Sequence, residues 1–457
     1  MKLETRNRKP TISPARTAAF DILVRVEREA SYASELLHAT AYAQLPQLDH
    51  GLATELVMGV LRWRSVLDAE ISGHSQQPLG KLDLEVLTAL RLGLYQLRHL
   101  DRIPTHAAIH ESVELVKRSR KRSAAPFVNA VLRKLASAAP RPGDALAEPE
   151  AVAASALAQS YAHPLWLVER WVNSFGPAIT QKICLYDQSP PVTTLRLRNP
   201  NDEVMLRSEM GRGVTLDAGA LLSSARRLRS SEVARLHVLA TTHLAIQDEG
   251  SQLVAALVGT GARILDCCAA PGGKTQAIAD HNPNVTVVAV EIHPHRARLL
   301  RRLVLAKNVH VIAADIRDLA LSLKFDCILA DVPCSGTGTL ARNPEIKWRL
   351  KPADLTDLQA RQIAILRAAL AHAAPRGRVI YSTCSLEEEE NEAVVDAVLT
   401  ADPFIRLLDC RVELERLKSE KQLIWPDLAS LTYGPCLRTL PGVHPCDGFF
   451  AAVLEKQ

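Results

Sequence analysis

The sequence predicts a multidomain protein with an all-α bundle at its N-terminus, a small α/β module in the middle and a C-terminal α/β domain with a doubly wound parallel sheet. The chain has 457 residues, more than one ordinary domain contains. Apolar residues recur at helical spacing from residue 14 to about residue 138. From about Ala240 onward β-type runs alternate with helical stretches, which is typical of a parallel sheet with crossover helices.

Composition narrows the class of protein further. Hydrophobic residues make up 47% of the chain and charged residues 23%, as in globular proteins that fold in water. The basic N-terminus precedes no apolar signal segment, and no run of about 18 apolar residues could cross a bilayer. We therefore expect a cytoplasmic protein without a membrane partner. Nine cysteines without a Cys-x-x-Cys pair predict reduced thiols and no metal site.

The N-terminal domain is expected to span residues 1–140. The apolar residues of "PARTAAFDILVRVERE" (14–29) lie on one helical face, and its leading proline suits a first turn. Further stretches carry the same pattern and complete a bundle of five or six helices: 52–71, 84–100, 107–119 and 126–137. The segment "APRPGDALAEPE" concentrates proline, glycine and charge, so a linker is predicted over residues 141–159.

Two further domains are expected after the linker. Residues 160–237 are predicted to form the small α/β module, because an aromatic helical stretch, "YAHPLWLVERW", precedes the strand-like "VTTLRLRN". Residues 238–457 are predicted to form the domain with the doubly wound sheet. Its five strands are expected in "ARILDCC", "VTVVAVEI", "VHVIAADI", "FDCILADVP" and "RVIYSTC".

Acidic residues end four of these five runs. They are Asp266, Glu291, Asp315 and Asp331, and the fifth run ends at Cys384. A single acid in such a position often only caps the following helix. Ligands of open parallel sheets bind outside the carboxyl ends of the strands, so four acids together favour a ligand site at that edge.

The loop after the first of these strands, "DCCAAPGGKT", is rich in small residues and suits close approach of a ligand to the backbone. It lacks the first glycine of the phosphate-binding motif G-x-x-x-x-G-K-[ST], and it contains no G-x-G-x-x-G. Glu291 suits the diol of a ribose. An adenosine-type ligand without phosphates therefore fits best. S-adenosyl-L-methionine meets that description, with Asp315 at the adenine and the loop at the methionine end.

Two cysteines follow the fourth and fifth strands. Cys334 lies in "ADVPCSGTGTLARNPEIKW" and Cys384 in "YSTCSLEEEEN", and both are expected at the same sheet edge. Two thiols beside a methyl donor suggest methylation of cytosine, because carbon 5 becomes nucleophilic only when a thiolate adds to carbon 6. The adduct is undone when a base removes the carbon-5 proton, and Asp331 is a candidate to assist the addition from near the ring nitrogen.

These segments resemble the motifs of the Nop/Sun family of RNA (cytosine-5) methyltransferases. The likeness includes "IQDEGSQLVA" and the terminal "DGFFAAVLEK" as well as the loop and the two cysteine segments. Upstream, "IPTHAAIHESVELVKR" and "FVNAVLRKL" resemble the NusB-like helical RNA-binding domain. The combination implies a Rossmann-like methyltransferase domain, S-adenosyl-L-methionine as cofactor and 16S ribosomal RNA as substrate.

The resemblance also implies roles for individual residues. Cys384 would be the nucleophile, Cys334 would assist product release, and Asp331 would contact the cytosine ring. We expect the enzyme to be a monomer. The methyl-donor pocket would be lined by Cys268, Ala269, Ala270, Pro271, Gly272, Gly273, Lys274, Glu291, Asp315 and Asp331.

Alternative interpretations compete with this one. An ATPase built on "PGGKT" and a non-catalytic RNA-binding or assembly factor are the rival functions, although the intact acids and thiols argue against the second. The basic stretch 116–123 is either a solvated face or, as we favour, a contact for RNA phosphates. His106 and His110 lack further metal ligands and are expected to be ordinary helix-surface residues. Ser385 and Glu388 match a capping box, which predicts a helix that starts directly after Cys384.

Overall fold

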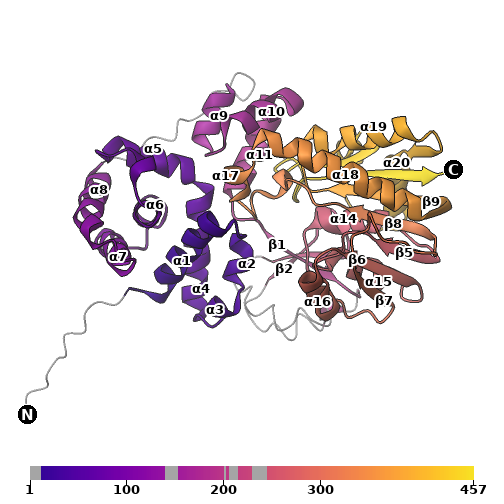
Figure 1. Cartoon of the computed structure of the whole chain (residues 1–457), viewed down its shortest axis with the longest axis horizontal. Coiled ribbons are helices and arrows are strands. Elements are labelled where there is room, and N and C mark those ends of the chain that lie inside the picture. Colours follow the sequence, from indigo (N-terminus) through magenta and orange to yellow (C-terminus); the bar gives the residue numbers. More distant parts are fainter. Residues whose placement is uncertain (1–11, 139–152, 200–201, 205–214, 229–243) are drawn as a thin grey trace, which may run out of the picture. The chain divides into compact units, whose positions relative to one another are not determined.

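The computed structural model describes residues 12–138, 153–199, 202–204, 215–228 and 244–457, and its contacts divide the chain into two compact units (Figure 1). The first unit contains Met1–Ser189 together with Ala341–Arg349. The second contains Pro190–Leu340 and Leu350–Gln457. Residues 160–237, which we expected to form one module, therefore fall into both units: the helices belong to the first and the strands to the second.

Every regular element described in the first unit is a helix, which confirms the predicted bundle. The apolar faces of the helices meet in a core that includes Ile22, Leu56, Leu90 and Val128. The predicted helix at 52–71 is divided at Trp63 into two helices. The helices are α1 (Pro14–Glu29), α2 (Ala33–Leu37), α3 (Thr40–Ala43), α4 (Gln47–Arg62), α5 (Arg64–His74), η1 (Leu79–Lys81), α6 (Leu84–His99), α7 (Thr105–Arg118), η2 (Arg122–Ala124), α8 (Ala125–Ser137), α9 (Ala154–Ser160), α10 (Leu165–Phe175), α11 (Pro177–Gln188) and α17 (Ile346–Arg349).

The linker expected at 141–159 lies largely outside the described residues. Its last part belongs to helix α9, which begins at Ala154. Alanines and a leucine dominate this helix, and they are residues that favour the helical state. The proline, glycine and charge that predicted a linker are concentrated before residue 151.

The short segment Ala341–Arg349 is an integral part of the helical unit. Lys347 is only 1% exposed, and its Nζ donates hydrogen bonds to the carbonyl oxygens of Arg62 at 3.1 Å and Ala162 at 3.0 Å. The indole Nε1 of Trp348 donates to the carbonyl oxygen of Leu61 at 2.6 Å. Burial lowers the pKa of Lys347 to about 7, so the two carbonyls hold an amine that is only partly charged at neutral pH.

The second unit contains two sheets. The smaller one has the order β2-β3-β1-β4, with antiparallel pairs throughout. The larger one has nine strands in the order β11-β12-β13-β9-β8-β5-β6-β7, and β10 also pairs with β13. The strands are β1 (Thr193–Leu197), β2 (Leu216–Ala218), β3 (Ala225–Leu228), β4 (Leu244–Ile246), β5 (Arg263–Asp266), β6 (Thr286–Glu291), β7 (Val309–Ala313), β8 (Phe325–Asp331), β9 (Ala373–Thr383), β10 (Ile405–Leu408), β11 (Thr432–Tyr433), β12 (Cys436–Thr439) and β13 (Phe449–Lys456).

All five predicted strands occur, and they form the parallel part of the large sheet, β9-β8-β5-β6-β7. Strand β13 runs antiparallel to β9 and extends the sheet, and β12 and β10 pair with its first and second halves. The predicted doubly wound fold is therefore confirmed, with an antiparallel extension that we did not predict. Such an extension is common in large sheets of this kind.

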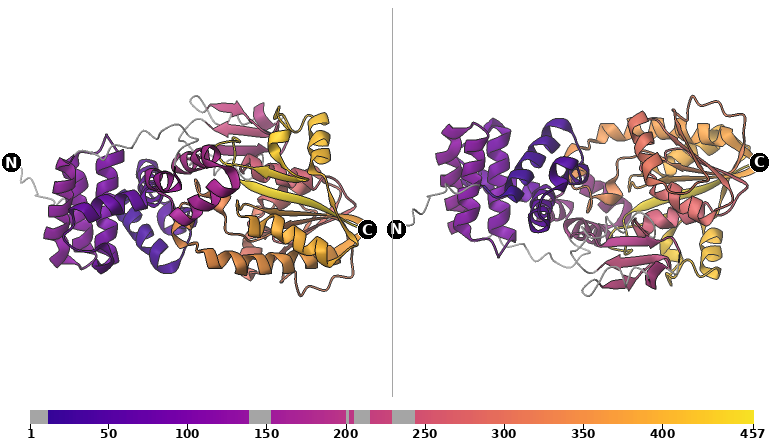
Figure 2. Two further views of the ribbon diagram at one scale, coloured as in Figure 1. Left: turned by 90° about the horizontal axis from the view of Figure 1, so that it is seen from above. Right: turned by 90° about the horizontal axis from the view of Figure 1, so that it is seen from below.

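Helices cover both faces of the large sheet (Figure 2). Successive residues of a strand point to opposite faces, so Ile264 packs with the core under α14, α15 and α20, whereas Leu265 packs with the core under α18 and α19. The sheet therefore lies between two layers of helices, and the loops at the carboxyl ends of its parallel strands emerge between these layers. The helices of this unit are α14 (Glu249–Leu257), α15 (Gly273–His281), α16 (Pro294–Leu303), η4 (Thr337–Thr339), α18 (Pro352–His372), η5 (Glu388–Glu390), α19 (Glu392–Ala401), α20 (Cys410–Ser419) and η6 (Ala429–Leu431).

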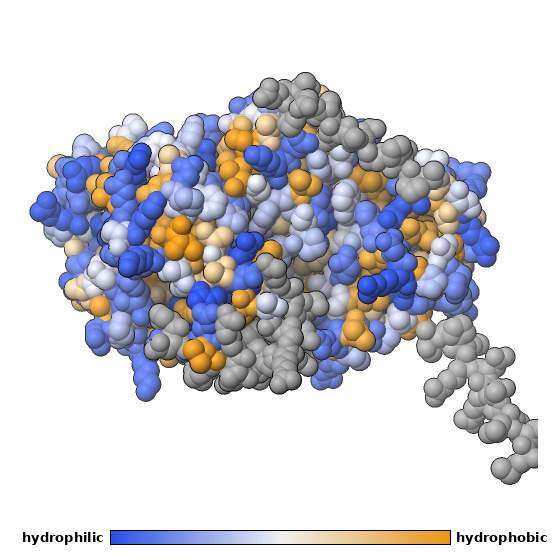
Figure 3. Space-filling view, turned by 180° about the vertical axis from the view of Figure 1, so that it is seen from behind, coloured by the Kyte–Doolittle hydropathy of each residue, from blue (hydrophilic) through white to orange (hydrophobic). Residues whose placement is uncertain are grey.

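The visible surface is chemically mixed. On the face shown in Figure 3, hydrophobic side chains occur in small patches between hydrophilic ones. This is the usual condition of a folded domain in water, where single exposed apolar side chains are common. Among the described helices, none is both long and apolar enough to span a bilayer.

Replacing Lys347 by alanine tests the role of the inserted segment. The change leaves the carbonyls of Arg62 and Ala162 without their donor and opens a cavity, so we expect the free energy of unfolding of the helical unit to fall by about 3 kcal/mol. Urea unfolding followed by circular dichroism measures this change. Lys182→Ala, at an exposed position of α11, should leave the transition unchanged. Equal transitions for both variants would contradict a structural role for Lys347.

Candidate functional site

The two thiols singled out in the sequence meet beyond the ends of β8 and β9. These strands pair in parallel with Asp331 opposite Ser382, so both chains leave the sheet at the same level. The Sγ atoms of Cys334 and Cys384 lie 3.3 Å apart, and the backbone N–H of Cys384 donates to the sulfur of Cys334 at 3.3 Å. This separation is too long for a disulfide bond, and both cysteines are free. The predicted convergence of the two residues is present in the structure.

A buried carboxylate holds the two thiol loops together. Glu390 is fully buried and accepts hydrogen bonds from the backbone N–H and the hydroxyl of Ser335, from the hydroxyl of Ser385 at 2.5 Å and from the amide of Gln362 at 2.9 Å. The two serines also lie within hydrogen-bond distance of each other, at 3.0 Å. Each serine directly follows one of the two cysteines, so the carboxylate fixes the relative position of the sulfur atoms.

Gly338 allows a close approach of three backbone segments. Its N–H donates to the carbonyl of Cys384 at 2.9 Å, and its own carbonyl accepts from the N–H of Gly448 at 2.8 Å. A Cβ atom on residue 338 would lie 2.3 Å from the carbonyl oxygen of Gly448 and 2.9 Å from that of Cys384. The glycines of "SGTG" and "DGFF" are therefore required where the segments touch.

The surroundings of Cys334 favour the protonated form of its thiol. Hydrogen bonding to Cys384, followed by burial, raises the pKa of Cys334 well above its ordinary value. Cys334 is therefore a protonated thiol at neutral pH and can donate its hydrogen to the neighbouring sulfur.

The helix that we expected to start at Ser385 begins further along the chain. Ser385 accepts a hydrogen bond from the N–H of Glu387 at 3.0 Å, and a short 3₁₀ turn, η5, follows. Helix α19 begins only at Glu392. The capping-box prediction is wrong because the hydroxyl of Ser385 accepts from the N–H of Glu387 instead of Glu388, and the N–H of Ser385 donates to the hydroxyl of Thr383 at 3.2 Å.

The small-residue loop lies at the same sheet edge, after β5. Its backbone is held by hydrogen bonds from Cys267 to the carbonyl of Leu329 and from Ala269 to that of Val290. Gly272 adopts a left-handed conformation with φ of +115°, and a Cβ there would lie 2.7 Å from the side chain of Leu300. The loop therefore passes directly into α15 at Gly273, with no room for a larger residue at position 272.

The acids predicted at the strand ends converge on this loop. The environment of Cys268 indicates this convergence. Burial raises the pKa of its thiol well above the ordinary value, and so do the negative charges of four nearby acids, Asp266, Asp331, Glu291 and Asp315. Asp266 is itself buried, with Oδ2 accepting from the hydroxyl of Thr275 at 2.7 Å. Burial raises the pKa of Asp266 to about 7, although the bond from Thr275 opposes the shift. The loop therefore sits in a strongly acidic surrounding.

Lys274 balances one of these acids. Its Nζ lies 2.8 Å from Oδ2 of Asp331, whose Oδ1 accepts from the hydroxyl of Ser382 at 2.8 Å. Burial alone would lower the pKa of Lys274, but the charge of Asp331 and the hydrogen bond to it raise the pKa above its ordinary value. Asp331 is thus a fixed carboxylate between the loop and the strand that leads to Cys384.

Glu291 and Asp315 differ in their availability. Glu291 is 4% exposed, and one of its oxygen atoms accepts from the N–H of His293 at 2.9 Å. Asp315 lies at the surface and is paired through both oxygens with Arg317, which lowers the pKa of the carboxyl. A ligand that uses Asp315 must share it with this arginine, a neighbour that we did not predict.

Three functional neighbours escaped the sequence analysis. Glu390 stands in a run of four glutamates, and no local feature distinguishes the buried one. Gln362 lies in the middle of α18 and Thr337 in η4, and both reach the thiol loops from other elements. Within the described part of the chain, no group of three or more His, Cys, Asp and Glu side chains has the arrangement of a metal site. His106 and His110 accordingly join no such group.

Gly338→Ala tests the close approach of the thiol loops. The added methyl group must push against two carbonyl oxygens, so we expect a loss of about 2 kcal/mol in stability and a separation of the two sulfur atoms. Mild oxidation followed by mass spectrometry measures that separation, because the wild type should form the Cys334–Cys384 disulfide much faster than the variant. Gly51→Ala, where a Cβ meets open space, should behave like the wild type. Equal oxidation rates would contradict the packing argument.

Asp266→Asn tests the buried acid. A carboxyl whose pKa rises on folding, here from 3.8 to about 7, favours the folded state at low pH, and this contribution is lost as the pH rises through about 7. The free energy of unfolding of the wild type, relative to that of the variant, should therefore fall between about pH 4 and pH 7 by up to about 1.4 kcal/mol per unit. Urea titrations at each pH measure it. Parallel pH profiles would contradict the raised pKa, and Asp396→Asn, at an exposed site, should give them.

Family models and solved structures match both units of the chain. A family model described as "16S rRNA methyltransferase RsmB/F" matches residues 257–455, and the NusB family model matches residues 13–137. The crystal structure of PH0851 superposes with a TM-score of 0.79 at 20% identity and covers 98% of this chain and 100% of that chain. NSun6 from Pyrococcus horikoshii, solved with SFG, superposes with a TM-score of 0.53 at 19% identity, over 63% of this chain and 97% of that one. These likenesses show the fold.

Curated relatives match the chain almost from end to end. The "Probable ribosomal RNA small subunit methyltransferase B" of Bacillus subtilis is 32% identical, over 97% of this chain and 98% of that protein. The protein named "Ribosomal RNA small subunit methyltransferase B" in Vibrio cholerae is 32% identical, over 98% of both chains. The "Putative methyltransferase Rv1407" of Mycobacterium tuberculosis is 34% identical, over 98% of both chains. The chain therefore belongs to the RsmB/F family of ribosomal RNA methyltransferases, enzymes that use S-adenosyl-L-methionine as the methyl donor.

Proposed function

We propose that this enzyme methylates carbon 5 of a cytosine in 16S ribosomal RNA, and that Cys384 forms a transient covalent bond to carbon 6 of the base. The observation that carries the proposal is the approach of two free thiols to 3.3 Å at the sheet edge that also holds the acidic loop. Cytosine methylation at carbon 5 needs a nucleophile and a second group for release. Two adjacent thiols, of which Cys334 is held protonated, meet both needs.

The acidic edge suits the methyl donor, which when bound supplies an electrophilic methyl group on a positively charged sulfur. Carboxylates at the loop attract a cation and repel a triphosphate, so the negative charge around the loop counts against the rival function of an ATPase. We propose that residues Cys268 to Lys274 and Asp331 bind the methionine end, that Glu291 accepts from the ribose hydroxyls and that Asp315 lies at the adenine. The free oxygen positions of Glu291 and the glycine-lined backbone of the loop support this assignment.

The residues of the chain would act in sequence on the cytosine. The thiolate of Cys384 would add to carbon 6, and the electron pair of the C5–C6 double bond would move to carbon 5, which would take the methyl group as its bond to the donor sulfur breaks and leaves a neutral thioether. Asp331, fixed by Lys274 and Ser382, contacts the ring. A base then removes the proton from carbon 5, the double bond re-forms and the C6–S bond breaks. Cys334, held as a thiol, donates a hydrogen bond to the departing sulfur of Cys384.

The basic stretch 116–123 bears on how the enzyme binds RNA. In the basic stretch 116–123, Lys117, Arg118 and Lys121 pair with Glu114, Asp21 and Asp83 respectively. Exposed pairs of this kind are weak, so RNA phosphates can compete for these cations. We propose that this stretch contacts RNA, and that the enzyme acts as a cytoplasmic monomer. The reactive geometry of both thiols favours an enzyme over a non-catalytic assembly factor.

Alanine variants of the two cysteines test the mechanism. Cys384→Ala removes the nucleophile and should abolish methyl transfer to an unmodified 16S transcript. Cys334→Ala leaves addition intact and slows release, so a protein–RNA adduct that resists denaturation should accumulate. Gel electrophoresis with labelled methyl donor measures both outcomes, and mapping of 5-methylcytosine in the product identifies the base.

Cys327→Ala is the matched control, since this thiol is buried near the opposite end of β8. It should methylate at the wild-type rate without an adduct. An adduct formed by Cys384→Ala, or normal turnover of Cys334→Ala, would show that the two roles are assigned wrongly. A methyl group found on another atom would refute the cytosine-5 assignment.

A further inference from the structure

Helix α16 lies in a strongly basic part of the second unit. Residues 292–314, which include this helix, contain four arginines, one lysine and no aspartate or glutamate. The segment therefore has a formal charge of +5, which equals the formal net charge of the entire chain. The acidic and basic residues of the rest of the chain cancel each other. A local concentration of one sign of charge creates a field that attracts an anionic partner.

One face of α16 is fixed against the sheet and the small-residue loop. Leu300 is fully buried and packs with Ala289 of β6 and Ala269 of the loop. Nη2 of Arg296 donates a hydrogen bond to the carbonyl oxygen of Ala270, in the same loop, at 3.3 Å. The helix is therefore held in place from one side, and its opposite face is turned to solvent.

The solvent-exposed face of α16 carries two arginines beside two leucines. Arg298 and Arg302 are four residues apart, and so are Leu299 and Leu303, which places each pair one turn apart on the same side of the helix. All four residues are exposed, the leucines by 45% and 52%. We call these four residues the α16 face. A charged row next to an exposed apolar row is typical of an interaction surface.

The charges of the α16 face are not balanced by acids. Among the described residues, neither Arg298 nor Arg302 has an ion-pair partner. The exposed helix α20 differs, since its Arg411 lies 3.3 Å from Glu415, one turn further along. Like charges four residues apart on a helix repel each other. An anion bound between the two guanidinium groups of the α16 face would remove this repulsion.

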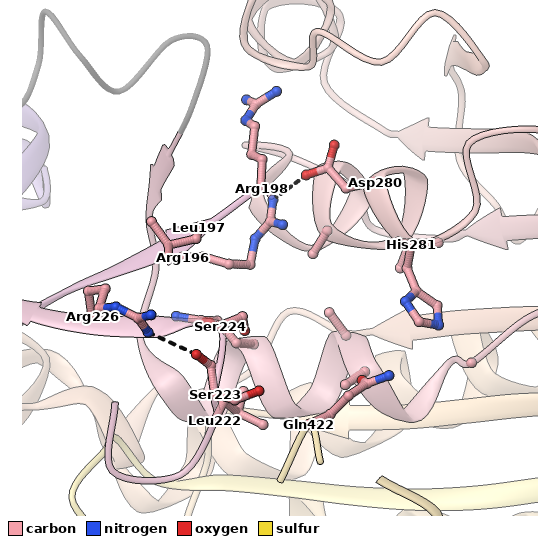
Figure 4. Close-up of a pocket in the computed structure, with 16 residues that line it drawn as sticks. Arg196, Leu197, Arg198, Leu222, Ser223, Ser224, Arg226, Asp280, His281 and Gln422 are labelled. Atoms are coloured by element: carbon pink, nitrogen blue, oxygen red, sulfur yellow. Dashed lines mark hydrogen bonds and ion pairs between the residues drawn. The ribbon is translucent and has the colours of Figure 1, made fainter. Parts of the chain in front are cut away.

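A second group of arginines in this unit is already engaged. In the pocket drawn in Figure 4, Arg196 pairs with Asp280 at 2.8 Å, and Arg226 donates to the carbonyl oxygen of Ser223 at 2.8 Å. Partners inside the protein therefore satisfy these two arginines. The arginines of the α16 face, by contrast, are open to an anion from solution.

RNA is the anionic partner that suits this face best. Arginine binds phosphate oxygens through two parallel N–H groups, and exposed leucines can cover the face of an unstacked base. The acids at the sheet edge repel phosphates, so bound RNA needs cations elsewhere on the unit. A membrane surface suits α16 less well. A helix on a membrane places its apolar face in the lipid, whereas the buried face of α16 is packed on the sheet.

The α16 face is remote from the reacting thiols. Helix α16 connects β6 to β7, and three strand spacings separate β7 from β8, the strand that leads to Cys334. At about 4.8 Å for each spacing, this lateral distance is about 14 Å. A nucleotide bound at the α16 face is therefore not the one that reacts.

We propose that the α16 face binds the backbone of the substrate RNA away from the target base, with phosphates at Arg298 and Arg302 and a nucleoside against Leu299 and Leu303. The proposal rests on the proposed action on 16S ribosomal RNA, but it does not depend on the cytosine-5 chemistry. Because the face is remote from the thiols, it contributes to RNA affinity and leaves the chemical step unchanged.

The double variant Arg298→Gln/Arg302→Gln tests the proposal. We expect the dissociation constant for an unmodified 16S transcript to rise about tenfold. The slope of its logarithm against the logarithm of the salt concentration should fall by about 1.5, as for the loss of two phosphate contacts. Filter binding at several salt concentrations measures both quantities. Methylation at saturating RNA should proceed at the wild-type rate.

Two further double variants separate charge from apolar contact. Arg298→Lys/Arg302→Lys keeps both charges, so the salt slope should stay at the wild-type value. Leu299→Ala/Leu303→Ala should weaken binding without a change in the salt slope, because no phosphate contact is lost. The glutamine variant should unfold at the wild-type urea concentration or above it, since it removes two charges that repel each other.

Arg406→Gln/Arg411→Gln is the matched control. It removes two exposed arginines of the same unit and changes the net charge equally, but both of these arginines are paired with glutamates. The affinity and the salt slope should therefore remain those of the wild type. Wild-type affinity and slope for the glutamine variant of the α16 face would overturn the proposal. An equal loss of affinity in the control would also overturn it, because the effect would then reflect net charge alone.

Vesicles of phosphatidylglycerol and phosphatidylethanolamine test the competing partner. The protein should not sediment with them. Sedimentation that the glutamine variant of the α16 face loses, together with unchanged RNA affinity, would assign this face to a membrane and overturn the proposal. The binding measurements need no methyl transfer, so a failure of the cytosine-5 proposal would be seen separately.

Discussion

The buried carboxylate of Glu390 is the contact on which the reactive geometry depends. Parallel pairing of β8 and β9 brings the two strands to the same level, but the sulfur atoms lie beyond the strands, where the ladder no longer constrains the chain. Hydrogen bonds from Ser335 and Ser385 to one carboxylate replace the ladder at that point. Loss of such an acceptor would leave several buried donors without partners, each at a cost of about 1–3 kcal/mol. A fully buried carboxylate therefore sets the distance between the two thiols.

The four acids at the sheet edge differ in whether a cation balances their charge. Asp331 is neutralised by Lys274, and Asp315 is paired with Arg317 at the surface. Asp266 and Glu291 have no ion pair among the described residues, so the net field at the loop is negative. Protonation of Asp266 near neutral pH limits this field. A cationic ligand would favour the charged form of the acid, so ligand binding and proton release from Asp266 are linked.

The sequence predicted the features that depend on local patterns. The five parallel strands, the acids at their ends and the two cysteines were visible because strand runs and their end points are marked by residue type. The antiparallel strands β10 to β12 are two to four residues long, and such short runs carry little alternation to detect. The burial of Glu390 and Lys347 was equally hidden, because it arises from contacts with distant segments. The misplaced helix start at Ser385 has a local origin, since the hydroxyl of Ser385 bonds with Glu387 and Glu390 and the α-helix begins only at Glu392.

The inserted segment Ala341–Arg349 has a consequence for how the protein is made. Residues up to Ser189 leave the ribosome first, yet the carbonyls of Leu61, Arg62 and Ala162 receive their partners only from residues 347 and 348. The helical unit is therefore completed only after most of the parallel sheet has been synthesised. Domains usually fold in the order in which they emerge from the ribosome. Here the first unit cannot complete its hydrogen bonds until part of the second unit has been synthesised. A truncation between the units would produce a bundle that lacks one of its own internal parts.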